Sequence, residues 1–313
     1  MSLSNSGDQT SLQFLRLDDV LEIQSLFSER WEIWSPRDTA AWEKRLDALP
    51  VGLRETYRDL WQRQAEYVER EKPIPTALES KWYELLGASQ VSGLVHSQKY
   101  PFLLDTAAFA VAVYRSAGLT GAVIDVGCHT GYHVDTYESL LKTDVFGVDR
   151  SRSAIETARS KLGPKRRIEL AVGDVTEVKL PQAALAICSD AFPSDQAGLT
   201  VLLRRLREVV SPDGYIVLSG NLLYLKKGLL AQVCKFLALR MVAHLVTGGW
   251  VGAQNRYDNR LFVVLSENQG RSVPRDLYLD WSEYGFPGYA NDLTTPWERK
   301  TQAFFRALML PSR

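Results

Sequence analysis

The sequence places an aspartate at or close to the end of each of four short apolar runs. These residues are Asp125, Asp149, Asp174 and Asp190. Apolar runs of this length, bounded by glycine or polar residues, are typical of buried parallel strands. Because parallel strands end at one edge of a sheet, we expect the four carboxylates to converge there. Carboxylates so placed accept hydrogen bonds from hydroxyl and amino groups of a ligand.

The first of these runs continues directly into a glycine-bearing loop, residues 122–131 (AVIDVGCHTG). This segment predicts a strand, a tight turn and the start of a helix. Gly127 and Gly131 let the backbone approach a ligand closely, because no Cβ intervenes. The first backbone N–H groups of the helix attract a carboxylate or a phosphate. We therefore expect a nucleotide-type cofactor at this loop.

Two common nucleotide motifs do not fit the loop. Counted from Gly127, the dinucleotide fingerprint Gly-x-Gly-x-x-Gly would place its other glycines at His129 and Tyr132. A Walker loop, Gly-x4-Gly-Lys-Ser/Thr, occurs nowhere in the sequence. The spacing therefore argues against nicotinamide, flavin and P-loop nucleotide sites.

The observed spacing, Asp125-x-Gly127-x-x-x-Gly131, resembles the first motif of the class I S-adenosylmethionine (SAM) dependent methyltransferases. Further elements follow in the order of that family, and the resemblance spans about residues 99–267. The matching elements are predicted strands at 145–149, 168–175 and 183–190, a helix at 199–210, a Pro-x-Gly turn at 211–214 and a strand at 215–220.

The resemblance implies an α/β fold with a doubly wound, seven-stranded, mostly parallel sheet. It also implies SAM as the cofactor and S-adenosylhomocysteine (SAH) as the product. In the family, the acid at the position of Asp149 accepts both ribose hydroxyls, and the carboxylate at the position of Asp174 accepts from the adenine amino group. The cofactor contacts that the resemblance implies are Asp125, Gly127, Cys128, His129, Thr130, Gly131, Asp149, Arg150, Gly173, Asp174, Val175, Ser189 and Asp190.

His129 departs from the family, which usually has a glycine at this position. Three interpretations stay open: the side chain folds outward and hydrogen-bonds locally, it lines the methionine end of the pocket and titrates near neutral pH, or the loop no longer binds SAM well. No catalytic residue is assigned. The candidates near the strand ends are Asp190, His129 and His133, and folding could bring in His96 and His244 from the flanks.

The chain divides into four predicted segments. Residues 1–10 are polar, and we expect them to be disordered. Residues 11–98 predict an N-terminal helical cap, in which prolines separate the helices. Residues 99–268 predict the SAM-binding Rossmann-like domain, beginning with a helix at 100–116, and residues 269–313 an aromatic-rich C-terminal extension.

Residues 229–246 form the most apolar stretch of the chain. Lys235 and Arg240 lie inside it, and each would cost about 2.5–3.5 kcal/mol to place in a membrane. We therefore expect a buried helix packed on the sheet and no membrane span. A hydrophobic lid over an apolar substrate is the alternative.

Two local predictions concern the edges of the domain. Residues 250–254 and 261–265 predict a hairpin around residues 256–259, which would close the seven-stranded sheet. Ser153 and Glu156 have the spacing of a capping box at the start of a helix.

Charge and cysteine content narrow the function. Lysine plus arginine and aspartate plus glutamate both number 37, so no overall basic surface favours nucleic acid. The fourth predicted strand ends in Ser189-Asp190-Ala-Phe192, which lacks the motifs of base-methylating enzymes. The 3 cysteines have no zinc spacing and suit a reducing cytoplasm, and we expect no metal.

The leading hypothesis is a SAM-dependent methyltransferase that acts on oxygen or nitrogen of a small, aromatic or apolar metabolite. A homodimer is possible, and nucleic acid is not expected as a partner. Two alternatives stay open. The first is a SAM-binding regulatory or scaffold subunit without transfer activity, and the second is an enzyme that uses SAM without methylating.

Overall fold

The computed structural model describes residues 17–33, 39–69, 75–87, 89–98, 100–193, 195–221, 225, 227–251 and 256–267. The predictions for residues 1–10 and 269–313 lie outside these residues.

A seven-stranded sheet forms the centre of the fold, in the order β3-β2-β1-β4-β5-β7-β6. Strands β1 to β5 are parallel, and β7 joins β5 and β6 in antiparallel register. The chain runs outward from β1 in both directions, so the ends of β1 and β4 form the crevice where open α/β sheets bind ligands. The predicted doubly wound sheet is confirmed. The strands are β1 (Val123–Val126), β2 (Val145–Asp149), β3 (Ile168–Val172), β4 (Ala183–Ser189), β5 (Val210–Asn221), β6 (Arg240–Val251) and β7 (Arg256–Ser266).

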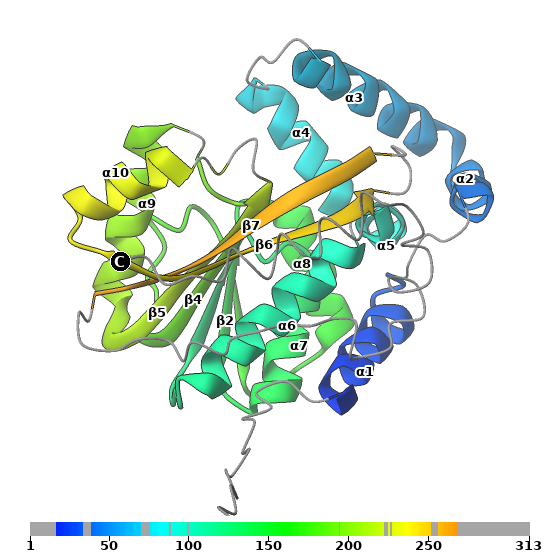
Figure 1. The fold of residues 1–313 in the computed structure, drawn as a ribbon. Coiled ribbons are helices and arrows are strands. Elements are labelled where there is room, and N and C mark those ends of the chain that lie inside the picture. The colour runs from blue at the N-terminus through cyan, green and yellow to red at the C-terminus, as the bar shows by residue number, and fades with distance from the viewer. Residues whose placement is uncertain are drawn as a thin grey trace, which may run out of the picture.

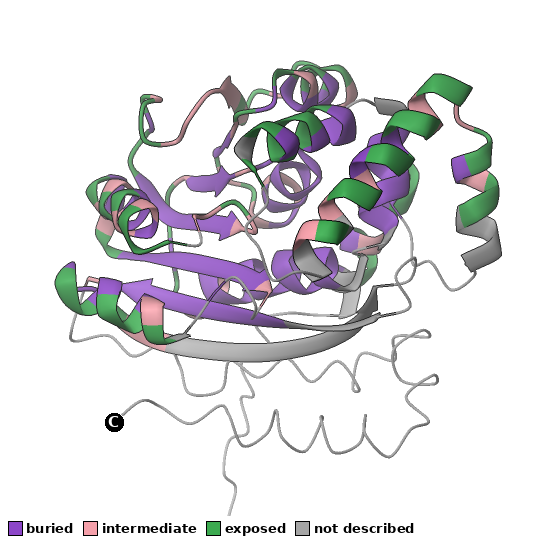
Figure 2. Ribbon diagram, turned by 90° about the horizontal axis from the view of Figure 1, so that it is seen from above, coloured by how far each residue is buried: buried purple, intermediate pink, exposed green. Residues whose placement is uncertain are grey.

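Helices cover both faces of this sheet (Figure 1). One face is buried under α6, α7 and α8, together with the N-terminal segment, and the other under α9 and α10. The central strands β1, β2 and β4 are buried along nearly their whole length, whereas the helices expose their outer faces, as Figure 2 shows. These helices are α6 (Tyr100–Ser116), α7 (Tyr132–Leu141), α8 (Arg152–Leu162), α9 (Gln196–Val209) and α10 (Lys227–Phe236).

The described part of the N-terminal region consists of short helices. Helices α2 to α5 share a separate apolar cluster in which Tyr57, Trp61 and Trp82 pack ring against ring. Here tryptophan serves to hold short helices together. The elements are α1 (Leu17–Ser25), the π-helix η1 (Leu26–Arg30), α2 (Thr39–Asp47), α3 (Val51–Glu69), α4 (Thr76–Gly87) and α5 (Ser89–Gln98).

The prediction of one buried helix over residues 229–246 is wrong. The segment contains α10 and, from Arg240, the edge strand β6. An apolar run suits a buried helix and a buried strand equally well, and pairing with β7 decides between them here. The hairpin is therefore longer than predicted, and Arg256 to Asn259 pair within β7 instead of forming its turn.

The predicted capping box at Ser153 is also wrong. The N-cap of α8 is Ser151, whose hydroxyl accepts from the Ala154 N–H at 3.2 Å. The Ser153 hydroxyl instead donates to Glu84 of α4, at 2.7 Å from its carboxylate. Ser153 therefore docks the N-terminal helices on the domain. Strand β5 begins at Val210, directly after α9. The predicted turn at 211–214 is therefore included in that strand.

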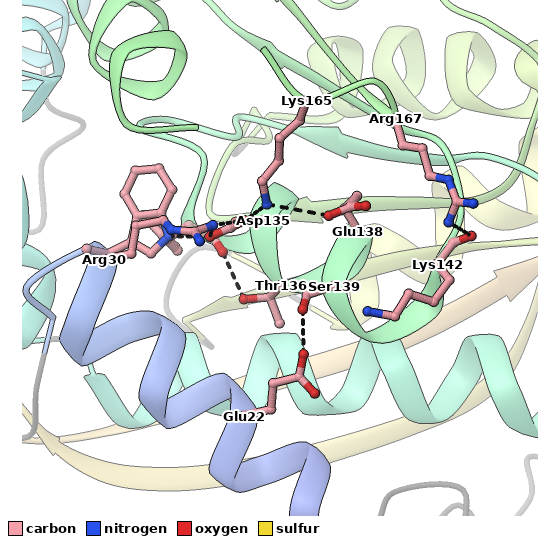
Figure 3. Close-up of polar contacts among 11 residues, drawn as sticks. Glu22, Arg30, Asp135, Thr136, Glu138, Ser139, Lys142, Lys165 and Arg167 are labelled. Carbon is pink, nitrogen blue, oxygen red and sulfur yellow. Dashed lines mark hydrogen bonds and ion pairs between the residues drawn. The ribbon is translucent and has the colours of Figure 1, made fainter. Parts of the chain in front are cut away.

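A buried carboxylate attaches the first N-terminal elements to the sheet domain (Figure 3). Asp135 of α7 is fully buried and accepts from Arg30 at 2.6 Å and from Lys165 at 2.5 Å. The Trp31 indole N–H donates to the same carboxylate at 3.1 Å. A buried carboxylate between two cations is tolerated because the adjacent cations compensate its charge.

Asp135→Asn should destabilise the protein by about 3 kcal/mol, because it leaves two cations without their shared partner. Urea unfolding measures this difference. The control is Asp59→Asn, which removes an exposed pair with Arg63 and should change the unfolding free energy by less than about 1 kcal/mol. Equal effects of the two substitutions would show that Asp135 does not anchor the N-terminal segment.

Candidate functional site

The ends of the first four parallel strands bring the four aspartates to one edge of the sheet. Asp125 lies in β1 opposite Gly147 of β2 and Ile187 of β4. Asp149 ends β2, Asp190 follows β4 directly, and Asp174 follows β3 after Gly173. The edge therefore gathers four carboxyl groups, as expected for a site that receives a cationic ligand with several hydroxyl groups.

The glycine loop between β1 and α7 is held between the second and fourth strand ends. Gly127 has φ of +73° and donates its N–H to the Val148 carbonyl at 2.8 Å. A Cβ at this position would lie 2.2 Å from the Ala191 Cβ, so only glycine fits. Gly131, with φ of +90°, is the N-cap of α7, and a Cβ there would crowd Ala158 at 3.1 Å.

Asp149 fastens this loop through its carboxylate. One oxygen accepts from the His129 N–H at 2.9 Å and the other from the Ser151 N–H at 2.8 Å. Burial raises the pKa of Asp149, and these two backbone hydrogen bonds act in the opposite direction. Each carboxylate oxygen keeps a further lone pair, so the residue can still accept from a diol.

Asp174 occupies the third strand end, in a more exposed position. Its carboxylate accepts from the Thr176 N–H at 2.9 Å and hydroxyl at 2.7 Å, and forms an ion pair with Arg150. Partial burial would raise the pKa of Asp174, but the hydrogen bonds from Thr176 and the Arg150 charge lower it overall. Gly173, just before it, donates its N–H to the Asp149 carbonyl at 2.9 Å and so ties the two strand ends together.

Asp125 carries the clearest sign of a missing ligand. The residue is 1% exposed, and its Oδ2 atom has no hydrogen-bond partner among the residues that the structure describes. Burial, followed by the charge of Asp149, raises the pKa of Asp125 well above its ordinary value. A buried carboxyl oxygen without a partner is unfavourable, and a ligand ammonium would satisfy it.

The fourth strand end is organised by a residue that the sequence did not reveal. Arg260 of β7 is 3% exposed and donates to Asp190 at 2.5 Å and to Ser189 at 3.2 Å. Its Nε also donates to the Ser219 hydroxyl of β5 at 2.7 Å, and its guanidinium lies 5.2 Å from the centre of the Phe102 ring. A carboxylate paired with arginine is a weak base, so this geometry does not support Asp190 as the catalytic base.

Three histidines lie in or near the glycine loop: His96 is next to His129, and Tyr132 contacts both His96 and His133. The His133 Nε2 lies 2.9 Å from the Leu103 carbonyl, and burial lowers the pKa of His133 to about 3. His133 is therefore neutral and inaccessible, which does not support it as a base. His129 is buried with φ of +50°, and its ring centre lies 4.6 Å from that of His96 of α5. The structure therefore places the His129 side chain inward rather than outward.

The rest of the predicted loop contacts helix α5 or the core. The Thr130 hydroxyl lies 3.0 Å from the Ser92 hydroxyl of α5. Burial raises the pKa of the Cys128 thiol well above its ordinary value, which favours an apolar, neutral role. Cys128, Cys188 and Cys234 are all buried and free. Sequence reasoning missed Ser92 and Arg260, since both reach the loop and the fourth strand end only through tertiary contacts.

The residues fit the cofactor that the motif implies. SAM combines a ribose diol, an adenine, a positively charged sulfur and an amino-acid end. The unpartnered Asp125 oxygen suits its ammonium, Asp149 suits the diol, and Asp174 suits the adenine amino group. The described residues contain no cluster of His, Cys, Asp or Glu suited to a metal, and within them no helix is long and apolar enough to cross a membrane.

Comparison with known families agrees with this geometry. Residues 123–214 match the model of a methyltransferase domain family. This segment contains the glycine loop and the strand ends at Asp149, Asp174 and Asp190. No curated protein matches the chain.

Several solved structures are similar to the chain. Mitomycin 7-O-methyltransferase MmcR is 18% identical, with a TM-score of 0.49, over 75% of this chain and 73% of that one. The N-methyltransferase NodS from Bradyrhizobium japonicum is 15% identical, with a TM-score of 0.44, over 53% of this chain and 87% of that one. A SAM-dependent methyltransferase from Clostridium acetobutylicum is 13% identical, with a TM-score of 0.43, over 52% of this chain and 90% of that one.

The strand order, the acidic strand ends and the family match have one explanation. Residues 123–214 form a methyltransferase domain, and the ends of its strands suit S-adenosylmethionine as the methyl donor.

Proposed function

We propose that the protein transfers a methyl group from SAM to an oxygen or nitrogen atom of a small, aromatic or apolar metabolite. The observation that carries this proposal is that helices α5 and α6 contact the glycine loop and strands β5 and β7 beside it. These contacts cover the edge of the sheet at which methyl transfer would occur.

Three contacts define this cover. Ser92 of α5 meets Thr130 of the glycine loop at 3.0 Å between hydroxyls. Thr106 of α6 meets Ser219 of β5 at 3.1 Å, and Phe102 of α6 lies against Arg260. A site enclosed by buried side chains suits a small acceptor better than a polymer, and enclosure excludes the water that would compete for the methyl group.

When bound, SAM supplies an electrophilic methyl group on a positively charged sulfur. The chain's own residues then have three tasks. Asp149 and Asp174 hold the nucleoside, the acidic strand ends favour its positive charge, and the Arg260–Asp190 pair keeps the fourth strand end in one conformation. Positioning of this kind can lower a barrier by about 7–11 kcal/mol at best.

The activity is tested by incubating the protein with methyl-labelled SAM and a set of phenols, amines and apolar alcohols. Label in one acceptor class, together with the release of SAH, supports the proposal. Calorimetric binding of SAM and SAH without transfer to any acceptor would favour the regulatory or scaffold alternative. Cleavage of SAM without a labelled acceptor would favour an enzyme that uses SAM without methylating.

Asp149→Ala should weaken SAM binding by about tenfold or more, because one charge-assisted contact to the ribose is lost. Calorimetry measures the change in Kd. The matched control is Asp144→Ala, an exposed residue just before the opposite end of β2, which should bind SAM as the wild type does. An unchanged Kd in a folded Asp149→Ala protein would contradict the ribose assignment.

Asp125→Asn should have opposite effects on stability and on binding. Because the folded-state pKa of Asp125 is raised, the wild type loses stability as pH increases from the ordinary aspartate pKa of about 3.9 toward the raised value. Asparagine has no proton to lose. Above that window the variant should therefore unfold at a higher temperature than the wild type.

The same variant should bind SAM more weakly, since it lacks the negative charge that would face the ammonium. Thermal unfolding with and without SAM, at several pH values, measures both effects. A variant that is less stable at neutral pH, or one that SAM stabilises as much as it does the wild type, would contradict this role of Asp125.

A further inference from the structure

Two of the four histidines in the sequence form a buried pair at the glycine loop. The His96 and His129 ring centres lie 4.6 Å apart, and the residues are 7% and 5% exposed. They come from different parts of the chain, one from α5 and one from the loop itself. Rings this close share one electrostatic environment, so their protonation is coupled.

His96 is held in a defined orientation by its own helix. Its Nδ1 lies 2.6 Å from the Ser92 carbonyl oxygen, which can only accept a hydrogen bond. Nδ1 therefore carries a proton, and Nε2 becomes a second donor whenever the ring is protonated. The Ser92 hydroxyl also contacts Thr130, so the helix that carries His96 is fixed on the loop.

His129 occupies a backbone conformation that a histidine would ordinarily avoid. Its φ of +50° lies in the left-handed region, which costs a residue with a Cβ about 1–2 kcal/mol. Glycine would adopt this conformation without that cost. The side chain is nevertheless present and turned into the interior, which indicates that it contributes something a glycine cannot.

The surrounding charge defines what this contribution is. Asp174 and Asp190 are paired with Arg150 and Arg260. Asp125 and Asp149 remain to make the strand ends acidic when they are ionised, which suits the sulfur and ammonium of SAM but repels the carboxylate of its amino-acid end. That carboxylate shares a carbon atom with the ammonium, so its donors must lie beside the unpartnered Asp125 oxygen. His129 stands on the same loop, and α7 begins beside it without a side-chain cap at Gly131.

We propose that His96 and His129 together bind the carboxylate of the amino-acid end of SAM, sharing a proton that this carboxylate stabilises. The proposal rests on the proposed function, because it concerns the same cofactor site. It makes the binding of the carboxylate depend on pH, since the imidazoles lose the shared proton as pH rises.

Other ionisable groups face the pair from each neighbouring element. Tyr132 of α7 lies 4.9 Å from His96 between ring centres, and burial raises the pKa of its phenol well above the ordinary value. His133 and the Arg260–Asp190 pair act on the same cluster, with His96 and Arg260 lowering the pKa of His133 and Asp190 raising it. These contributions partly cancel.

On the opposite side, the carboxylate of Asp149 accepts from the His129 N–H, and Asp125 lies in β1 below the loop. Both carboxylates favour a protonated imidazole when they are ionised. The expected pH dependence therefore belongs to the whole cluster, with the shared proton of the two histidines as its main component.

The test compares SAM with decarboxylated SAM, which keeps the sulfonium and the amino group but has no carboxylate. Calorimetry gives both dissociation constants at about pH 6 and about pH 8. For the wild type at the lower pH, SAM should bind about 10- to 100-fold more tightly than the decarboxylated compound. This affinity ratio, SAM over decarboxylated SAM, should decrease at the higher pH.

Two variants remove one ring each. His96→Phe keeps an aromatic ring without donors, and His129→Gly also relieves the left-handed strain, so at least one of them should fold. In either variant the ratio should fall to about one or below, because the acidic strand ends favour the more cationic compound. As the control, Asp144→Ala changes an exposed residue before the opposite end of β2 and should leave both dissociation constants, and therefore their ratio, unchanged.

The proposal is overturned if the wild-type ratio is near one, or if a folded His96→Phe or His129→Gly protein keeps the wild-type ratio. Absence of binding by both compounds to the wild type would instead refute the proposed function. The two failures are therefore distinguishable.

Discussion

The carboxylate of Asp149 is the contact on which the rest of the site depends. By accepting the His129 and Ser151 N–H groups, it fixes the glycine loop and the start of α8 at the end of β2. The loop can then run between the strand ends, with glycine at the crowded positions 127 and 131. Every proposed cofactor contact is placed relative to this one carboxylate, because each lies on a segment that it holds or on a neighbouring strand end.

The N-terminal helices belong to the same functional unit. Asp135 holds Arg30 and Trp31 against α7, and the Trp31 ring approaches Gly131 of the loop. Helix α5 adds Ser92 and His96 to the opposite part of the loop. We infer that loss of these helices would affect cofactor binding as well as the acceptor side, which is consistent with a site built from both parts of the chain.

Strands β1 to β4 were predictable because each is a short apolar run with an aspartate close to its end. The predicted helix at 100–116 coincides with α6, since its ends are marked locally. The prediction of a helix over residues 229–246 was wrong because hydrophobicity alone does not distinguish a buried helix from a buried strand. The predicted N-cap of α8 was wrong because two serines, Ser151 and Ser153, lie close together in the sequence. Only the tertiary contact of Ser153 with Glu84 shows which of them is not the cap.

The site was predictable in part for the same reason. Acids at strand ends are visible in the order of residues, whereas Arg260 and His96 reach the strand ends and the glycine loop from distant segments. No local pattern distinguishes a buried arginine that organises a strand end from an exposed one. The inward side chain of His129 also depends on α5, which lies more than one element away in the chain.

The most direct test of this account is a crystal structure of the protein with SAH. We predict that the ribose hydroxyls lie within hydrogen-bonding distance of the Asp149 carboxylate, with the adenine at Asp174 and the amino-acid end between Asp125 and His129. Nucleoside density away from these strand ends, or a glycine loop whose ligand does not approach Asp149, would contradict it.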